Sequence, residues 1–413
     1  MLNGCKEGFV PWAQTHWDSA VALFRQRRAL IISAEVDADI VARNEYLLRM
    51  HLHVLARCDW SAPQGRKPEQ VFVMLARHLS SPQAEVRCKG YAQAREMMIE
   101  GGESGEGAFA ALVLFPEADA TTKMLDLYHE HPKLRPQLFT LWREQGRAVP
   151  RALLNRAELQ GCDEALQEAA LAYAVSRPEI GVGLFRPYYA HLQSAVAPCC
   201  SGRLTALALW GALVRGETGS AEVLRRAVER EDDAEIRFGL LRLAALSADA
   251  QMLPVLRRLL EENPAQGARL LALHGSVEAI ETLLEALSQA ATMNAAARAW
   301  MWVRGKPLPQ KPRLQMIGQD DGQGVMPDSE GARAWWSQQR SALPPEGRML
   351  YGAPLSVPRL HALAQSRAGE SGRDLLDLLA LKLGRPLGIS PHVEQAKRRS
   401  LLQAIPANPY AQG

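Results

Sequence analysis

Two short histidine motifs are the first residues of this chain whose types could do chemistry. His51 and His53 stand in HLH, and His129 and His131 stand in HEH. Imidazole nitrogens are common zinc ligands, and a structural zinc ion takes four ligands. If residues 37–58 form a helix, His51 and His53 point to nearly opposite sides. His129 and His131 converge only in an extended segment. Neither motif has a third ligand at a recognisable distance, so we predict no metal site.

The cysteines do not suggest a site either. None of the six is in a CxxC pair, and adjacent cysteines at 199–200 allow only a strained vicinal disulfide. We expect six reduced thiols in a reducing compartment. They are Cys5, Cys58, Cys88, Cys162, Cys199 and Cys200.

The sequence contains no complete phosphate loop, calcium loop or nucleophile elbow. GGESGEG at 101–107 lacks the GK[ST] ending of a phosphate loop and the strand that precedes one, so we predict a flexible loop there. QDDGQG at 319–324 lacks the alternate-position ligands of a calcium loop. The chain has no GxSxG elbow, and its scattered Ser, His and Asp imply no triad. We therefore predict no catalytic residue, no cofactor and no enzyme activity.

Paired tryptophans in AWWSQQR at 334–340 are the remaining candidates, in a chain with few aromatic residues. On a helix, Trp335 and Trp336 share a face with Ala332 and Gln339. We favour a structural cap, with at least one ring buried against residues 280–303, such as Leu287 or Trp300. The alternative is a partner-binding hot spot, where Trp, Tyr and Arg dominate. That set is Trp335, Trp336, Arg340, Arg348 and Tyr351.

Helices must position these residues, because apolar side chains recur at helical spacing nearly throughout the chain. Abundant Leu and Ala with sparse Val, Ile and Thr also favour helix over sheet. Of the 413 residues, 47% are apolar. A chain of this length is too long for one ordinary domain. Segments 11–31 and 37–58 are predicted to form an antiparallel pair, with one apolar stripe of Ile40, Leu47, Leu48 and Leu55.

A helix–turn–helix pattern recurs along the chain. In 70–94 and in 222–246, a polar turn is followed by AEVR or AEIR, which places an acidic residue in the first turn of the second helix. VLRRAV at 223–228 recurs as VLRRLL at 255–260. Offsets of roughly 25–35 residues are typical of two-helix repeats, which bury their apolar faces by stacking. An irregular helical bundle is the alternative.

Charge and hydropathy limit the partners. The net charge is +3, from 48 basic and 45 acidic side chains, whereas a dedicated nucleic-acid binder has a larger or more clustered excess. The basic runs RQRR (25–28) and KRR (397–399) are short, and we predict that each lies on a solvated helix face. No apolar run approaches the ~20 residues of a membrane span, and the first residues contain no signal-peptide apolar region. We expect a cytoplasmic protein.

The helix pairs with AEVR and AEIR openings resemble HEAT-like repeats. The whole plan resembles a family of HEAT-repeat proteins encoded among bacterial type VI secretion genes. Three features carry the resemblance: the opening pair with HWDSAVALFRQRRALI and NEYLLRMHLHVL, the Ala/Leu-rich body, and the tail with ARAWWSQQR, GRMLYGAPLS and RRSLLQAI. The resemblance implies a bacterial cytosolic protein that works beside secretion machinery or its effectors, and it implies no catalytic residues.

We therefore predict an all-α fold, a HEAT-like α-solenoid with a small helical C-terminal module. The predicted segments are 1–66, an N-terminal helical hairpin; 67–304, the repeat body; 305–331, a flexible linker; and 332–413, the C-terminal module. The predicted function is a non-catalytic adaptor or chaperone-like scaffold that holds a type VI effector or tip component. Two alternatives stay open: an immunity protein that neutralises a cognate toxin, and a DNA-binding HEAT-repeat protein of the glycosylase type.

Overall fold

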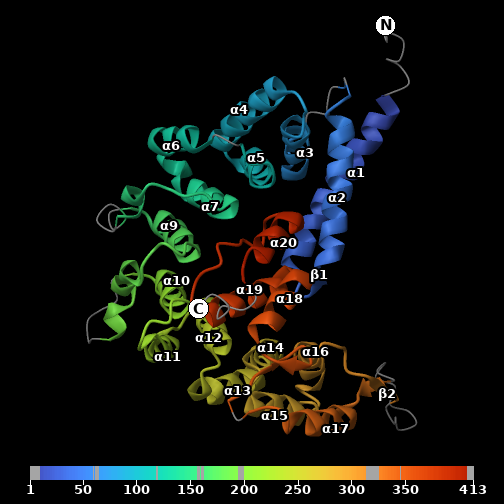
Figure 1. Ribbon diagram of the computed structural model, residues 1–413, viewed down its shortest axis with the longest axis vertical. Coiled ribbons are helices and arrows are strands. Elements are labelled where there is room, and N and C mark those ends of the chain that lie inside the picture. The colour runs from blue at the N-terminus through green and yellow to red at the C-terminus, as the bar shows by residue number, and fades with distance from the viewer. Residues whose placement is uncertain are drawn as a thin grey trace. The chain divides into compact units, whose positions relative to one another are not determined.

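The chain is mainly helical in a computed structural model (Figure 1). The structure describes residues 10–58, 60, 65–117, 120–155, 159, 162–193, 200–312, 325–344 and 346–406. By its internal contacts the chain divides into unit 1, which comprises Met1–Leu184, His361–Leu376 and Pro386–Gly413, and unit 2, which comprises Phe185–Leu360 and Asp377–Arg385. The all-α prediction is confirmed.

Most of the described helices lie entirely within one of the two units. Unit 1 contains α1 (Val10–Ile32), α2 (Ala38–Leu55), α3 (Pro68–Leu79), α4 (Ala84–Glu100), α5 (Gly102–Leu114), α6 (Ala120–Glu130), α7 (Arg135–Gln145), α9 (Glu164–Ser176) and α20 (Gln395–Gln403). Unit 2 contains α10 (Gly202–Leu213), α11 (Ser220–Arg230), α12 (Ala234–Ser247), α13 (Leu253–Glu262), α14 (Pro264–His274), α15 (Val277–Ala286), α16 (Met293–Arg304) and α17 (Ser329–Arg340). Helices α18 (Val357–Ser366) and α19 (Gly369–Leu383) each contribute residues to both units.

Short strands and 3₁₀ helices complete the described fold. β1 (Val36–Asp37) pairs with β6 (Arg367–Ala368), β2 (Gln310–Pro312) with β3 (Val325–Pro327), and β4 (Met349–Leu350) with β5 (Ala353–Pro354), all antiparallel. The 3₁₀ helices are Pro132–Leu134, Arg151–Leu154, Val182–Leu184, Arg186–Tyr188, Ala190–Leu192 and Ala250–Met252.

These units differ from the four predicted segments. Residues 361–376 and 386–406 pack with the N-terminal helices, so the predicted module at 332–413 is shared between both units. One reason is the Arg27 guanidinium, whose Nη2 donates to the carbonyl oxygen of His392 at 2.8 Å. In the predicted linker 305–331, residues 310–312 and 325–327 are paired strands and α17 begins at Ser329, while residues 313–324 lie outside the described residues.

The opening helices α1 and α2 pack against each other, as predicted. The predicted stripe on α2 is wrong for two of its residues, since Ile40 is 50% exposed and Leu47 is 39% exposed. Polar residues take the inward positions instead, because partners from α1 satisfy them. Glu45 Oε1 accepts from Arg27 Nε at 2.8 Å, and Asn44 Nδ2 donates to the Leu23 carbonyl at 3.2 Å.

The predicted flexible loop at 101–107 is also wrong, because α5 begins at Gly102. Gly101, with φ of 76°, ends α4, and Gly105 and Gly107 lie inside α5. A Cβ at Gly107 would lie 2.4 Å from the Pro68 carbonyl oxygen and 2.7 Å from Val71 Cβ, so glycine is what lets α5 approach α3 closely. Gly107 therefore serves helix packing.

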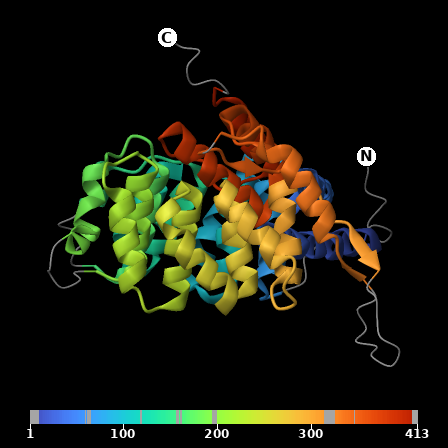
Figure 2. The same ribbon diagram turned by 90° about the horizontal axis from the view of Figure 1, so that it is seen from below.

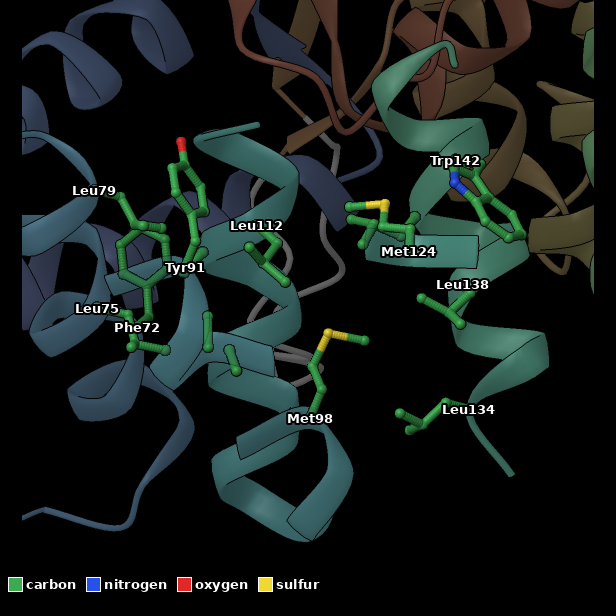
Figure 3. Close-up of a cluster of buried hydrophobic side chains, with 14 of the residues drawn as sticks. Phe72, Leu75, Leu79, Tyr91, Met98, Leu112, Met124, Leu134, Leu138 and Trp142 are labelled. Atoms are coloured by element: carbon green, nitrogen blue, oxygen red, sulfur yellow. The ribbon is translucent and has the colours of Figure 1, made fainter. Parts of the chain in front are cut away.

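The core of unit 1 runs through α3, α4, α5 and α7 (Figure 3). Buried apolar side chains from each helix meet there, which explains why these short helices are stable despite modest intrinsic propensity. The labelled side chains in Figure 3 include Phe72, Leu75, Leu79, Met98, Leu112, Leu138 and Trp142.

In unit 2, helices follow one another in chain order, as Figure 2 shows from yellow-green to orange. Helix α10 contacts α12, α12 contacts α14, and α14 contacts α16, while α11, α13 and α15 connect them. Both predicted helix–turn–helix segments are present as α3–α4 and α11–α12, with Glu85 and Glu235 in first turns. A HEAT-like solenoid over the whole chain stays a prediction.

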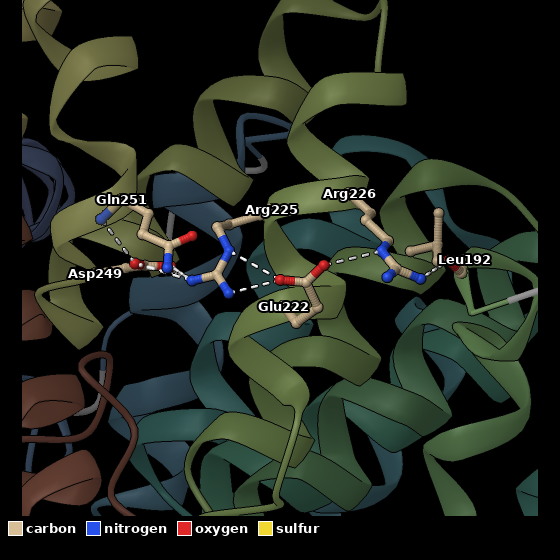
Figure 4. Close-up of polar contacts among 6 residues, drawn as sticks. All are labelled: Leu192, Glu222, Arg225, Arg226, Asp249 and Gln251. Carbon is tan, nitrogen blue, oxygen red and sulfur yellow. Dashed lines mark hydrogen bonds and ion pairs between the residues drawn. The ribbon is translucent and has the colours of Figure 1, made fainter.

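The repeated VLRR motif has a structural role in unit 2. Arg225 of the first copy binds Asp249 through Nη1, at 3.1 and 2.9 Å, and also pairs with Glu222 (Figure 4). Arg257, the same position in the second copy, donates from Nε to Thr282 Oγ1 at 3.0 Å. Each arginine therefore reaches a residue 24 or 25 positions further along the chain. The motif thus ties one helix pair to the next.

Candidate functional site

The segment EGRMLYGAPLS forms a hairpin whose backbone amides donate hydrogen bonds to carbonyls at the C-terminal ends of helices in unit 2. The amide of Met349 donates to the Gly275 carbonyl at 2.8 Å, just after α14. The amides of Tyr351 and Gly352 donate to the carbonyls of Trp302 and Val303, at 2.6 and 2.8 Å, in the last turn of α16. Carbonyls in a last helical turn have no partner within the helix, so the hairpin supplies their missing donors.

Arg348, at the start of this hairpin, caps the C-terminal ends of two helices, α12 and α14, with one side chain. Its Nη1 donates to the Leu246 carbonyl at 2.8 Å, and its Nη2 donates to Ala245 and Leu273 at 3.3 and 2.8 Å. Its Nε donates to the His274 carbonyl at 2.9 Å. A cation is favourable at a helix C-terminus, where the macrodipole is negative. Burial lowers the pKa of Arg348 to about 10, so the guanidinium remains charged at neutral pH.

Tyr351 is buried in the same hairpin turn. Its φ is 51° and that of Gly352 is 78°, and two successive positive φ values match the twist of a tight β-hairpin. The Tyr351 ring lies 5.2 Å from the Trp302 ring, between centroids, which compensates for a backbone conformation that tyrosine seldom adopts. Tyr351 is thus a packing residue of the hairpin.

The tryptophan pair packs on the neighbouring helices. Trp336 is 4% exposed on α17, which contacts α15. The Trp335 ring lies edge-on to Trp300 of α16, with 5.9 Å between centroids, and 6.5 Å from the Trp336 ring. The predicted burial of at least one ring is confirmed for Trp336, while the named Trp300 contacts the half-buried Trp335.

Few of the five candidate partner-binding residues are accessible to a partner. Trp335 is half-buried under the Arg304 guanidinium, which lies 5.9 Å from its ring centroid. Arg340 is exposed and pairs with Glu281, at 3.1 Å between Nε and Oε1. A partner would therefore meet Trp335 and Arg340, whereas Trp336, Arg348 and Tyr351 are engaged within unit 2.

A cavity of about 620 Å³ lies beside Arg348. Its lining combines aliphatic side chains with polar and charged ones, and His274 contributes the most deeply buried polar side chain there. Burial, together with the nearby Arg348 charge, lowers the pKa of His274 from 6.5 to about 4. The imidazole is therefore neutral at physiological pH. Lining residues include Leu213, Leu246, Leu253, Ser276, Leu378 and Lys382.

The buried histidine makes the stability of unit 2 depend on pH. Because its folded pKa of about 4 lies below 6.5, the unfolded chain binds the proton first as the pH falls. The free energy of unfolding should drop by about 3 kcal/mol between pH 6.5 and pH 4. Urea unfolding across this range measures the slope, and His274→Phe, which cannot titrate, should show a shallower one. Equal slopes for the two proteins would contradict the prediction.

Unit 1 has an apolar groove between α1, α5 and α7, with a volume of about 390 Å³. Phe24 lines its α1 side and stacks on Phe72, with centroids 3.6 Å apart. Ile32, at the end of α1, is 72% exposed at the groove edge. Arg28 and Glu106 form an ion pair at 2.5 Å between groove-lining side chains. The other apolar lining residues are Ile31, Pro68, Phe109, Ala110, Val113 and Leu114.

The predicted solvated face for RQRR is wrong for Arg27, which is buried against Glu45. The predicted face for KRR is likewise wrong for Arg398, whose Nη2 donates to the Ala364 and Gly372 carbonyls at 3.0 and 3.2 Å. Acceptors from distant segments make these burials possible. Burial lowers the pKa of Arg398 to about 10, which leaves it charged.

Metal, disulfide and membrane features can be assessed for the described residues. Among them, no group of three or more His, Cys, Asp and Glu side chains could hold a metal ion. His51 instead faces His16, with 2.8 Å between their Nδ1 atoms. No disulfide links Cys58, Cys88 and the other cysteines in the described part of the chain, and Cys5 and Cys199 lie outside it. None of the helices placed by the structure has the length and apolar character needed to cross a bilayer.

Comparison of the chain with protein-family models, with curated proteins and with solved structures gave no match. The functional argument therefore rests on the residues and contacts described above.

Proposed function

We propose that this protein is a non-catalytic, protein-binding scaffold, and that the apolar groove of unit 1 receives its partner. The observation that carries the proposal is the groove itself, with Ile32 largely exposed at its edge. An apolar groove between helices is a common receptor for the apolar face of a partner helix. Arg28 and Glu106, which pair with each other, place a polar ion pair beside the groove, as at the rim of many interfaces.

The use of basic side chains favours a protein partner over DNA. In the run at 25–28, Arg25 pairs with Glu69, Arg27 with Glu45, and Arg28 with Glu106. Binding of nucleic acid depends on basic side chains that neutralise phosphates and so release the counterions condensed on the nucleic acid. Here each of these arginines already has a carboxylate partner, which supports the protein-binding proposal over the DNA-binding alternative.

The resemblance to HEAT-repeat proteins of type VI secretion gene clusters suggests the kind of partner. We propose a type VI effector or tip component, held in the cytoplasm before export. An immunity protein would use the same groove on a toxin encoded nearby. The two roles differ in one outcome: only an immunity protein protects a cell that produces the isolated toxin.

Ile32→Arg should abolish capture of the partner, because it places a charge at the edge of the apolar groove. Since Ile32 is 72% exposed, folding should be unaffected. Tagged protein expressed in its own bacterium, followed by mass spectrometry, measures the enrichment of secretion components. Ile99→Arg is the matched control, because Ile99 is 42% exposed on α4 and does not line the groove.

Equal capture by Ile32→Arg and by the unchanged protein would contradict the groove as the binding site. Capture of nucleic acid alone, which weakens steeply as salt rises, would contradict the protein-binding function. Rescue of cells that produce a neighbouring toxin would assign the immunity role.

A further inference from the structure

The cavity of about 620 Å³ beside Arg348 has the size of a small-molecule site. Pockets for small molecules typically measure about 300–1,000 Å³ and combine apolar walls with a few polar groups. Every lining residue of this cavity belongs to unit 2, so the site is complete within one unit. It shares no lining residue with the groove of the proposed function.

The most deeply buried polar group of the cavity is an imidazole whose hydrogen-bonding capacity is unused. His274 lines the cavity and is 1% exposed. Neither ring nitrogen makes a hydrogen bond of normal geometry in the described part of the chain, although the Asp249 backbone lies nearby. A buried polar group without a partner destabilises the fold, and most such groups have one. A neutral imidazole offers one N–H donor, which a ligand in the cavity can satisfy.

The guanidinium of Arg348 gives the cavity a positive charge. Its four contacts are carbonyl oxygens, which carry only partial charges, and no carboxylate pairs with it among the described residues. Helix α15 also begins at the cavity, where Ser276 and Val277 are lining residues. The N-terminal end of a helix carries a partial positive charge. A buried cation and a helix N-terminus together favour an anion in the cavity.

The exposed charges of the lining do not reverse this preference. Lys382, Glu278 and Glu346 are exposed lining residues of mixed sign. Solvent and salt screen exposed charges, whereas a buried charge acts through a medium of lower dielectric constant. The buried Arg348 therefore determines which sign of charge the cavity accepts.

The walls of the cavity indicate the rest of the ligand. Its described lining contains no Phe, Tyr or Trp, so it offers no such ring on which an aromatic ligand could stack. Aliphatic side chains from α10, α12, α13, α15 and α19 line the space instead, and they favour an aliphatic chain. These side chains are Leu213, Leu246, Leu253, Val277, Leu378 and Leu381.

We propose that the cavity of unit 2 binds a monocarboxylate with an aliphatic chain, a ligand of the fatty-acid class. The carboxylate accepts a hydrogen bond from the His274 imidazole and neutralises the charge of Arg348, while the chain lies along the leucine side chains of the wall. This site acts independently of partner capture by unit 1, because the two sites have no lining residue in common.

Octanoate is the probe that tests the head group and the chain together. Titration calorimetry of the full chain at neutral pH should show a single bound molecule, with a dissociation constant of about 1 mM or below. Octan-1-ol and octylammonium have the same chain without the negative charge, and they should bind at least about ten-fold more weakly. Equal binding of the three probes would overturn the carboxylate as head group, and absence of octanoate binding would overturn the site.

Ala250→Trp tests the location of the site. Ala250 lines the cavity and is exposed, so a large ring at this position obstructs the cavity without disturbing the core. The variant should lose most of its affinity for octanoate. Ala342→Trp is the matched control, because Ala342 is an exposed residue of unit 2 outside the lining, and it should bind like the unchanged protein. Thermal melting checks that both variants fold. Unchanged octanoate binding by Ala250→Trp would contradict the proposed location.

His274→Leu tests the contact with the carboxylate. A hydrogen bond to a charged group is stronger than one to a neutral group, so the loss of the imidazole should reduce the preference for octanoate over octan-1-ol several-fold. This ratio of two affinities does not depend on how much the substitution changes folding stability, which urea unfolding measures separately. An unchanged ratio would overturn the role of His274 in recognising the carboxylate.

Discussion

Replacing Arg348 with alanine should lower the free energy of unfolding of unit 2 by about 3–5 kcal/mol. The change removes four hydrogen bonds and leaves carbonyl oxygens at the ends of α12 and α14 without these donors. A buried polar group without a partner costs far more than a typical hydrogen bond contributes. Urea unfolding, followed by tryptophan fluorescence, measures the loss.

Arg340→Ala is the matched control for this experiment. Arg340 is an exposed arginine from the same part of the chain, and its ion pair with Glu281 should contribute only about 0–1 kcal/mol. Arg348→Lys should recover little stability, because one ammonium group cannot reach carbonyls of two helices in the geometry of the guanidinium fork. A near-neutral effect of Arg348→Ala would show that the hairpin does not hold these helix ends.

Trp336→Ala should cost about 3–5 kcal/mol, because it removes a large, almost fully buried side chain from the contact of α17 with α15. Trp335→Ala should cost less, since that ring is only half-buried beside Trp300. The melting temperature should fall in part of the transition, because units of helical arrays unfold in pieces. Thermal melting of both variants measures this ranking.

Partner capture by the same variants separates a structural role from a binding role. If the tryptophans stabilise unit 2, capture should fall only as much as folding falls. If they are a hot spot, the double alanine variant should keep its melting curve and lose about 2 kcal/mol or more of binding free energy. An unchanged melting curve with binding abolished would contradict the structural role.

The helices and several of their ends could be predicted from the sequence because they depend on neighbouring residues. The apolar spacing in 222–246 produces α11 and α12, and the acidic Glu235 lies in the predicted first turn. Ser356 caps α18 by accepting from the Arg359 amide at 3.3 Å. Gly384, with φ of 62°, directly follows α19, where glycine is common because it tolerates a positive φ. Each of these features involves residues within a few positions of one another.

The burial of one tryptophan was also predictable, because a helix that places two large rings on one face must cover them. The buried ring is Trp336, and the half-buried Trp335 makes the contact with Trp300. The adaptor role and the type VI setting depend on resemblance alone, and they stay predictions.

Only the tertiary structure decided which polar residues are inside and which apolar residues are outside. Glu45 occupies an inward position because Arg27 of another helix neutralises it, so Ile40 and Leu47 point to solvent. Arg348 is engaged because carbonyls 102 and 103 residues earlier in the chain lie beside it. Sequence periodicity treats a charged side chain as a surface residue. Burial becomes favourable only when a partner arrives from a distant segment, and local spacing does not encode that arrival.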